Sequence, residues 1–316
     1  MELILWYLSR TSFRDRPRMR IEPLSPLFGA EIRDVDLCTD LDAATFAEIE
    51  RTFNERSVVL FRGQRISDAE HVRFSRRFGE LEIHVLREYV KPQHPEIYVL
   101  SNIVENGRAI GIKDAGNYWH TDLSYTRAPS RGSIMYALEV PHRGGEPLGD
   151  TQFASTAAAY DALPDDMKRK LSGLKAVHRF WDRYIRERKA AGSDVVVSEE
   201  RRAGTPDVVH PVVRTHPHTG RKCLYVNEGF TVGLGGVPDD EARALLAELY
   251  AHCTRPEFVY RHRWRVGDLV MWDNCATIHR ATVDYALPER RLMQRTTLRG
   301  TEVFWRDRPP STEKLS

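Results

Sequence analysis

Apolar positions recur along this chain with two spacings, one typical of helices and one typical of strands. Four segments have the composition or the spacing of helices. In the clearest of them Leu41, Phe46, Ile49 and Phe53 lie three to five positions apart and share one face. The predicted helices are 42–56, 67–79 and 239–253, with two more in 154–171 that divide around Pro164, the second beginning at Asp165 and Asp166.

Short apolar runs between turn residues predict β-strands. The run from Ser133 to Glu139 is apolar over most of its length, as expected of a central strand. The predicted strands are 57–61, 82–85, 133–139, 208–215, 222–226, 258–264, 268–272 and 291–299, with further short strands about a turn in 20–36. Numerous short strands with a few helices outside them favour a mainly β fold with flanking helices, arranged as a double-stranded β-helix, or jelly roll.

One long segment fits neither spacing. From Trp181 to Asp207 the chain is dense in charge and contains Gly192 and Gly204. This composition predicts a mobile surface loop. Two interpretations stay open: the loop closes over a site between the strands that it joins, or it is a solvated excursion with no role.

Composition narrows the class of protein and its compartment. The chain has 316 residues, with 47 basic and 45 acidic side chains and a formal net charge of +2. This balance favours neither nucleic acid nor a membrane as partner. The four cysteines are scattered without metal-binding spacing, which favours a reducing cytoplasm.

The two ends of the chain differ in character from its middle. The first residues are apolar but lack a preceding basic region and are too short for a signal peptide or a spanning helix. We therefore interpret residues 1–18 as an N-terminal extension. Residues 19–316 are expected to form a single domain.

Candidate chemistry begins at Trp119-His120-Thr121-Asp122. In an extended strand alternate side chains point to one face, so His120 and Asp122 are expected to project side by side. With one more imidazole they would form the two-histidine, one-carboxylate set of non-haem Fe(II) oxygenases. A His-x-Asp triplet is weak evidence alone, because it arises by chance in a chain with many histidines and acids.

The downstream sequence strengthens this interpretation. Trp272-Asp273-Asn274 is followed five residues later by His279, and an arginine lies about a dozen residues beyond. With these motifs the chain resembles the taurine/α-ketoglutarate dioxygenase family from about Met19 to Gly300. The resemblance implies a jelly-roll dioxygenase that uses Fe(II) and 2-oxoglutarate, with His279 as the third iron ligand beside His120 and Asp122.

The resemblance also implies a site for 2-oxoglutarate. Arg291 would bind its distal carboxylate, helped by Thr151, since a guanidinium binds a carboxylate through two parallel hydrogen bonds. Arg290 is the competing candidate, because the spacing in the family varies. An insertion at 146–149, just before Thr151, makes that contact less certain unless the insertion is looped out.

The substrate is expected to be a small anion. By resemblance Arg295, which lies on the same face of a strand as Arg291, would bind its charged group, with His84, Phe180 and Phe230 as further substrate residues. A sulfonate, a sulfate ester or a carboxylate such as an aryloxy acid would fit, and hydroxylation would lead to C–S or C–O cleavage. Taurine is doubtful, because Gly116 replaces the asparagine that contacts it in the family.

Molecular oxygen is the other reactant, and we expect a homo-oligomer. Two other kinds of protein share part of this pattern. A metal-dependent hydrolase also uses two histidines and a carboxylate, but the sequence shows no evident general base and leaves Arg291 without a purpose. A jelly-roll binding module without activity is the other, and the intact ligands and arginines argue against it.

Overall fold

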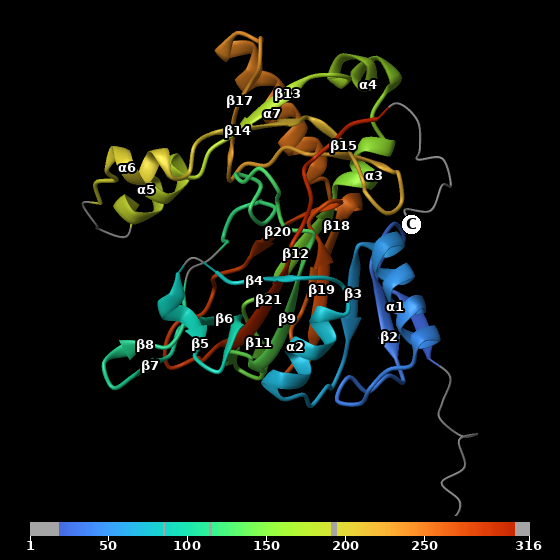
Figure 1. The fold of residues 1–316 in the computed structure, drawn as a ribbon, viewed down its shortest axis with the longest axis vertical. Helices are drawn as coiled ribbons and strands as arrows, with labels where there is room; N and C mark the ends of the chain where they lie inside the picture. Colours follow the sequence, from blue (N-terminus) through green and yellow to red (C-terminus); the bar gives the residue numbers. More distant parts are fainter. Residues whose placement is uncertain (1–18, 85, 114–115, 191–194, 307–316) are drawn as a thin grey trace, which may run out of the picture.

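The structure, a computed structural model, describes residues 19–84, 86–113, 116–190 and 195–306. The predicted N-terminal extension, residues 1–18, lies outside the described residues, as does part of the predicted loop at 181–207. Within the described ranges the chain is mainly β with a few helices (Figure 1).

The largest sheet has nine strands, which come from both ends and the middle of the chain. They are β1 (Arg20–Pro23), β2 (Ala30–Arg33), β3 (Val58–Phe61), β4 (Leu81–Glu82), β5 (Val90–Lys91), β6 (His94–Ser101), β9 (Gly132–Glu139), β19 (Leu269–Asp273) and β21 (Leu292–Leu298). Eight run in the order β1-β2-β3-β19-β9-β21-β6-β5, and β4 pairs with β21. The pairing is antiparallel except between β2 and β3. β9 thus has the central place predicted from its apolar run.

Both faces of this sheet are buried, and the alternation along each strand decides which side chain faces which layer. In β3, Val59 and Phe61 face the helices α1 (Ala43–Arg56) and α2 (Asp68–Arg76). Val58 and Leu60 point to the opposite layer. That layer is a small sheet in the order β18-β12-β20. Its strands are β12 (Thr151–Ser155), β18 (Val259–His262) and β20 (Thr277–Ala281).

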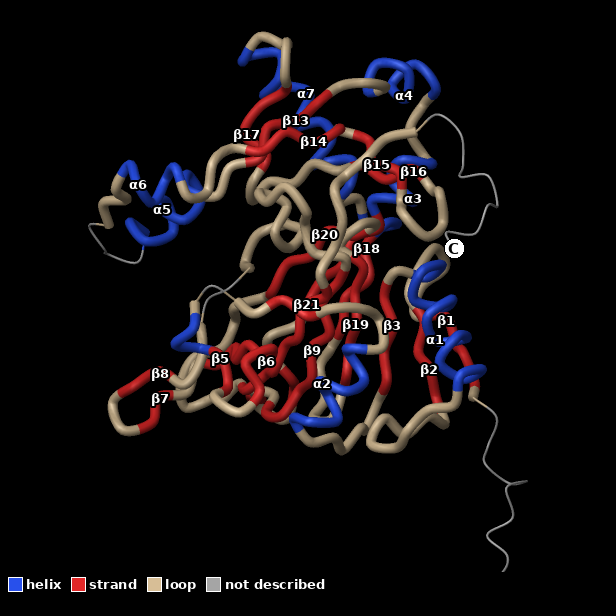
Figure 2. Tube along the Cα trace, viewed as in Figure 1, coloured by secondary structure: helices blue, strands red, loops and turns tan. Residues whose placement is uncertain are grey.

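A second group of short elements covers one end of these layers (Figure 2). They are β13 (Lys175–His178), β14 (Val208–Pro211), β15 (Val213–Thr215), β16 (Lys222–Leu224), β17 (Thr231–Leu234), α3 (Thr156–Asp161), α4 (Asp165–Leu171) and α7 (Asp239–Cys253). Their apolar side chains form one cluster, which includes Trp119 and Ile278. Each of these two residues precedes a candidate histidine ligand, so the cluster anchors both segments of the candidate site.

Two short hairpins complete the strands of the described residues: β7 (Val104–Glu105) with β8 (Arg108–Ala109), and β10 (His142–Arg143) with β11 (Glu146–Pro147). No helix in the described ranges is both long and apolar enough to cross a bilayer.

The helix predictions are largely confirmed. α1 begins after the cap residue Asp42 as the pattern predicts, and α7 has the predicted bounds. α2 opens with the capping box of Ser67 and Glu70 but ends at Arg76. The predicted division of 154–171 at Pro164 is confirmed, because α3 ends at Asp161 and α4 begins at Asp165, but the predicted start is wrong, because β12 continues to Ser155.

The predicted mobile surface loop at 181–207 contains regular structure that the composition did not indicate. The described part contains α5 (Trp181–Ala190) and α6 (Glu199–Ala203). High charge disfavours burial but does not disfavour a helix, because Glu, Arg and Lys are good helix formers. Aromatic residues at the start of α5 pack together, with the Phe180 and Tyr184 ring centroids 5.5 Å apart.

Candidate metal centre and active site

His120 and His279 are held together through their backbones. His279 lies in β20, and His120 forms an isolated antiparallel bridge to it. His120 N donates to the carbonyl of His279 at 3.0 Å, and His279 N donates to that of His120 at 2.7 Å. Two histidines about half the chain apart are therefore neighbours, with ring centroids 4.2 Å apart.

Asp122 joins them by a different route from the one predicted. The sequence pattern predicts a continuous strand, but the chain turns at Asp122, and Leu123 has a left-handed φ of 57°. The strand prediction for this segment is therefore wrong. The turn is closed by Thr126, whose N–H and hydroxyl both donate to the carbonyl of Leu123 at 2.9 and 2.8 Å.

The three side chains converge without bonding one another. His120 Nε2 is 3.7 Å from Asp122 Oδ1, and His279 Nε2 is 3.9 Å from Asp122 Oδ2. Both distances are too long for hydrogen bonds. They suit ligands that each lie roughly 2.1 Å from one ion, which can be at most about 4.2 Å apart. The buried set therefore fits a metal ion.

Protonation also fits metal binding. Burial alone would raise the pKa of Asp122, but the Arg295 cation outweighs it and holds that pKa well below its usual range. Burial, helped by the Arg295 cation, holds the pKa of His279 well below its usual range, so this imidazole is neutral. His120 Nδ1 lies 2.9 Å from the carbonyl of Tyr118, which assigns the proton to Nδ1 and leaves Nε2 as a lone-pair donor.

Two side chains bind the Asp122 carboxylate directly. Ser133, at the start of β9, donates its hydroxyl to Oδ2 at 2.7 Å. Arg295, in β21, donates from Nη1 to Oδ1 at 3.3 Å. Sequence reasoning singled out Arg295 but not Ser133. A serine that opens an otherwise apolar central strand is the signal that could have identified it.

Arg290 and Arg291 are adjacent in sequence but have opposite surroundings. Arg290 forms two hydrogen bonds with Glu139, at 2.8 and 3.0 Å, with its side chain 51% exposed. Arg291 lies just before β21 and is buried, and its Nε has no hydrogen-bond partner in the described ranges. The Arg291 guanidinium lies 5.6 Å from the ring of Tyr285.

The insertion before Thr151 forms a hairpin and leaves β12 intact. Glu146 and Pro147 pair with β10, and a Cβ on Gly149 would lie 3.3 Å from Arg291 Nε. In the β12–β20 pairing Thr151 is opposite Ala281, and Ala281 lies two residues after His279 in β20. β12 therefore begins at Thr151 with its pairing intact, and the contact expected of Thr151 stays a prediction.

Aromatic rings gather beside His120. Tyr125 lies 4.7 Å from both Phe180 and Phe230, measured between ring centroids. Phe230 is 6.2 Å from the His120 ring. The backbone joins these segments, because Arg179 N donates to the carbonyl of Phe230 at 2.8 Å. Phe180 and Phe230 were predicted for this place, whereas Tyr125 was missed although it belongs to the same motif.

His84 lies on the Arg295 side of the centre. Its ring stacks on Tyr98 with centroids 3.9 Å apart, and the Arg295 guanidinium lies 5.5 Å from the same tyrosine ring. Burial and the Arg295 cation lower the pKa of His84 to about 4. Its Nδ1 accepts a hydrogen bond from Leu86 N at 3.1 Å, so the neutral ring carries its proton on Nε2. His84 is therefore a neutral hydrogen-bond donor.

Gly116 borders the His120 ring. Its φ is +79°, and a Cβ there would lie 2.7 Å from His120 Cε1. No larger residue fits without moving the histidine. The asparagine expected at this position in a taurine enzyme therefore has no room in this backbone.

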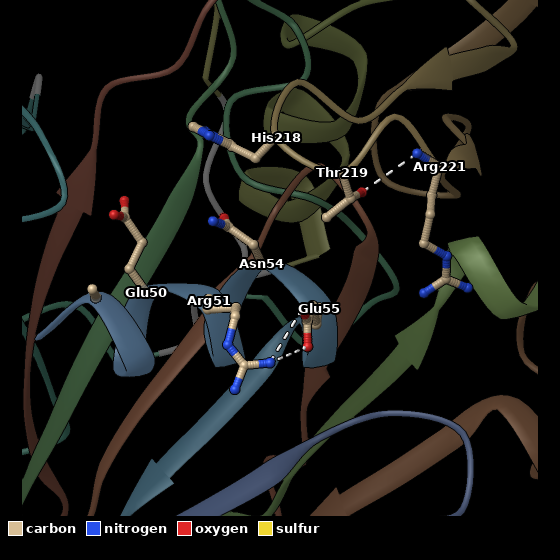
Figure 3. A pocket seen from close by; sticks show the side chains of 8 residues that line it. Glu50, Arg51, Asn54, Glu55, His218, Thr219 and Arg221 are labelled. Atoms are coloured by element: carbon tan, nitrogen blue, oxygen red, sulfur yellow. Dashed lines mark hydrogen bonds and ion pairs between the residues drawn. The ribbon is translucent and has the colours of Figure 1, made fainter. Parts of the chain in front are cut away.

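An open cleft of about 580 Å³ lies elsewhere, between α1 and the turn that joins β15 to β16 (Figure 3). None of the three converging side chains lines it. Its charged residues are already paired: Arg51 with Glu55 at 3.2 Å, and Glu50 with Arg131 at 3.2 Å. We assign this cleft no part in the reaction.

Comparison with known proteins decides between the remaining interpretations. The model of the family described as taurine catabolism dioxygenase TauD, TfdA matches residues 20–297. The chain belongs to this family.

Its relatives support the assignment along nearly the whole length. The chain is 40% identical over 286 residues to an alpha-ketoglutarate-dependent 2,4-dichlorophenoxyacetate dioxygenase of Cupriavidus pinatubonensis, covering 87% of this chain and 96% of that protein. It is 34% identical to an alpha-ketoglutarate-dependent sulfate ester dioxygenase of Pseudomonas putida, covering 89% of each. The solved structure of AAD-2 in complex with Mn(II) and N-oxalylglycine is similar with a TM-score of 0.77 and 30% identity, covering 92% of this chain and 100% of that one.

Membership of the TauD, TfdA family makes this chain an α-ketoglutarate-dependent dioxygenase, with Fe(II) as metal and α-ketoglutarate, also called 2-oxoglutarate, as cosubstrate. The enzyme class predicted from the motifs is confirmed. The hydrolase and the binding module are set aside, and the converging His-Asp-His set fits the metal that the family uses.

Proposed function

We propose that this dioxygenase hydroxylates an aryloxy carboxylic acid at the carbon beside its ether oxygen. One oxygen atom of O2 enters that C–H bond, and the other enters succinate as 2-oxoglutarate loses carbon dioxide. For an aryloxyacetate the product is a hemiacetal, which separates into a phenol and glyoxylate. The observation that carries this proposal is the aromatic group of Tyr125, Phe180 and Phe230 beside His120, together with the Arg295 cation that binds Asp122.

In this proposal His120, Asp122 and His279 hold the iron. When bound, Fe(II) with 2-oxoglutarate supplies the oxidising power for insertion of oxygen into a C–H bond. The three side chains would supply two imidazole nitrogens and one carboxylate to the ion, the ligand set typical of non-haem Fe(II) oxygenases. Ser133 keeps the Asp122 carboxylate in one orientation by binding Oδ2.

Arg291 is the proposed partner of the distal carboxylate of 2-oxoglutarate, with Thr151 beside it. The burial of the Arg291 guanidinium and its unpartnered Nε support this choice, because a buried cation without an anion is costly. Arg290 is already paired with Glu139 at the surface. Thr151 Oγ1 accepts from Trp264 at 3.0 Å, which leaves its own hydroxyl hydrogen for a ligand.

The proposed substrate residues would bind the two ends of the substrate, its carboxylate and its aryl ring. Arg295 would bind the carboxylate, and the Nε2–H of the neutral His84 would donate to the same group. Phe180 and Phe230 would pack against the aryl ring, since aromatic rings favour edge-to-face and offset contacts. The closed space at Gly116 supports the exclusion of taurine.

Further features of the protein are proposed with this function. The small β18-β12-β20 sheet packs across an apolar layer from the long sheet, as the two halves of a jelly roll do. Residues 19–316 are proposed to be one domain preceded by an extension. Location in the cytoplasm and assembly into a homo-oligomer remain predictions, to be checked by fractionation and by light scattering.

A substrate panel tests the proposed function. We expect phenoxyacetate to drive 2-oxoglutarate-dependent oxygen consumption, with release of phenol and succinate in equal amounts, and with kcat/KM at least ten-fold above those of dodecyl sulfate and taurine. Oxygen uptake and colorimetric detection of phenol are the measurements. Turnover of an alkyl sulfate or of taurine in preference to every aryloxy acid would overturn the choice of substrate.

A further inference from the structure

The turn that carries Asp122 needs support from outside itself. The backbone bridge at His120 lies just before it, and the next residue, Leu123, is left-handed with φ 57°. A left-handed backbone is strained for a residue other than glycine. A ligand on such a turn keeps its place only when neighbouring groups hold the backbone.

Asn274 supplies this support. Its side-chain Oδ1 lies 3.2 Å from Thr121 Oγ1 and 3.4 Å from Asp122 N, which both donate to it. Its Nδ2 donates to Ser130 Oγ at 2.6 Å. Thr121 Oγ1 also lies 2.9 Å from the Asn274 carbonyl. One buried carboxamide thus joins the beginning of the turn to its end.

The other side of the turn is tied in the same way. Ser130 Oγ lies 3.4 Å from the carbonyl of Asp122, and Asn274 N donates to the carbonyl of Arg131 at 2.9 Å. The exposed fractions of Asn274, Thr121 and Ser130 are 1, 2 and 1%. With so little water present, each of these bonds would be costly to leave unmade.

Asn274 is itself rigidly placed by the turn between β19 and β20. Cys275 N donates to Asp273 Oδ1 at 2.7 Å, and Thr277 Oγ1 donates to the carbonyl of Asp273 at 2.7 Å. β20 then carries His279. The same short turn therefore positions two ligands. It leads into the strand that carries His279, and its Asn274 side chain holds the segment that carries Asp122.

We propose that Asn274 and Thr121 are positioning residues for the metal: they touch neither metal nor substrate, and they hold Asp122 at the distance from His120 and His279 that one ion requires. The proposal rests on the ligand set proposed above. Partners that orient ligands in this way typically change metal affinity by about 10- to 100-fold when removed.

The test uses Mn(II), which binds without turnover, and the full-length protein freed of metal by chelator. Thr121→Val removes the hydroxyl and keeps the shape, whereas Thr121→Ser keeps the hydroxyl. We expect the Kd for Mn(II), measured by EPR of the free ion, to rise about ten-fold or more in Thr121→Val and to stay within two-fold of the parent in Thr121→Ser.

Thr52→Val is the matched control. Thr52 is equally buried, and its hydroxyl donates to the Glu48 carbonyl at 2.8 Å within α1. In the metal-free state we expect Thr52→Val to lose about as much thermal stability as Thr121→Val. Its Kd for Mn(II) should equal that of the parent. An unchanged Kd in Thr121→Val, or an equal rise in Thr52→Val, would overturn the positioning role.

Two more variants keep the outcome interpretable. Ser130→Ala removes a smaller part of the same network and should raise the Kd for Mn(II) by a few-fold, which provides the test if Thr121→Val does not fold. Asp122→Ala examines the ligand set: Mn(II) binding as tight as in the parent would refute the proposed ligands themselves. A loss in Asp122→Ala without any effect in Thr121→Val and Ser130→Ala would refute only the positioning role.

Discussion

At the scale of single residues, burial separates side chains that the sequence leaves equivalent. From the sequence alone Arg290 and Arg291 are rival partners for 2-oxoglutarate. Their surroundings differ, because one is paired with Glu139 at the surface and the other is buried with an unpartnered Nε. Spacing places both near the metal, but only side-chain packing decides which one faces inward.

Substitution of each arginine tests this difference. Arg291→Gln should raise KM for 2-oxoglutarate at least 30-fold, equivalent to about 2 kcal/mol, because a buried carboxylate would lose its charged partner. Arg290→Gln, the adjacent control, should change KM less than two-fold, since an exposed ion pair contributes little. Steady-state oxygen uptake at varied 2-oxoglutarate gives both values. The reverse ranking would assign the role to Arg290.

At the scale of elements, the sequence predicts best what depends on one regular pattern. α7 and β9 have continuous apolar spacing, and the structure confirms both. The sequence from His120 to Asp122 predicts an extended strand, but in the structure the chain turns at Asp122. A hydrogen bond from Asp122 N to Asn274, which is distant in sequence, holds this turn. α5 is missed because its charge suggests a loop, although Phe180, Trp181 and Tyr184, which are close in sequence, pack together at its start.

The cap of α2 gives a prediction at this scale. Ser67 and Glu70 form a capping box, and Ser75 joins α2 to β21 through Thr296 Oγ1 at 2.7 Å. Ser67→Ala should lower the free energy of unfolding by about 1 kcal/mol, because an N–H at the helix start loses its acceptor.

The corresponding change in α6 serves as comparison. Ser198 caps α6 through Arg201 N, but this short helix buries none of its residues. We expect Ser198→Ala to change the unfolding free energy by less than about 0.5 kcal/mol, because α6 can fray without loosening the core. Urea denaturation compares the two variants. Equal losses would contradict the view that α2 contributes to the stability of the whole domain.

At the scale of the whole molecule, buried neutral histidines make stability depend on pH. Burial lowers the pKa of His71 to about 4 and that of His178 to about 3. Between pH 6.5 and these values the unfolded chain binds protons that the folded protein does not. The free energy of unfolding therefore rises with pH across this window and falls on acidification, by about 1.4 kcal/mol per pH unit for each such histidine.

His71→Gln should make this dependence shallower. We expect the slope of unfolding free energy against pH, measured by urea denaturation of the metal-free protein between pH 6.3 and 4.7, to decrease by about 1.4 kcal/mol per pH unit. The exposed His142 provides the control, and His142→Gln should keep the slope of the parent. An unchanged slope in His71→Gln would show that this histidine does not titrate on unfolding.

The position of Phe180, outside the segments that carry the three metal ligands, has a consequence for how such an enzyme diversifies. Phe180 stands at the start of an excursion between β13 and β14, whereas Asp122 and His279 depend on bonds among β9, β20 and the turn at Asn274. The sequence between β13 and β14 can therefore change during evolution, so that other substrates bind, while the metal ligands and the dioxygenase activity are retained. A mutagenesis library confined to residues 179–186 is therefore expected to change substrate preference while leaving metal binding intact.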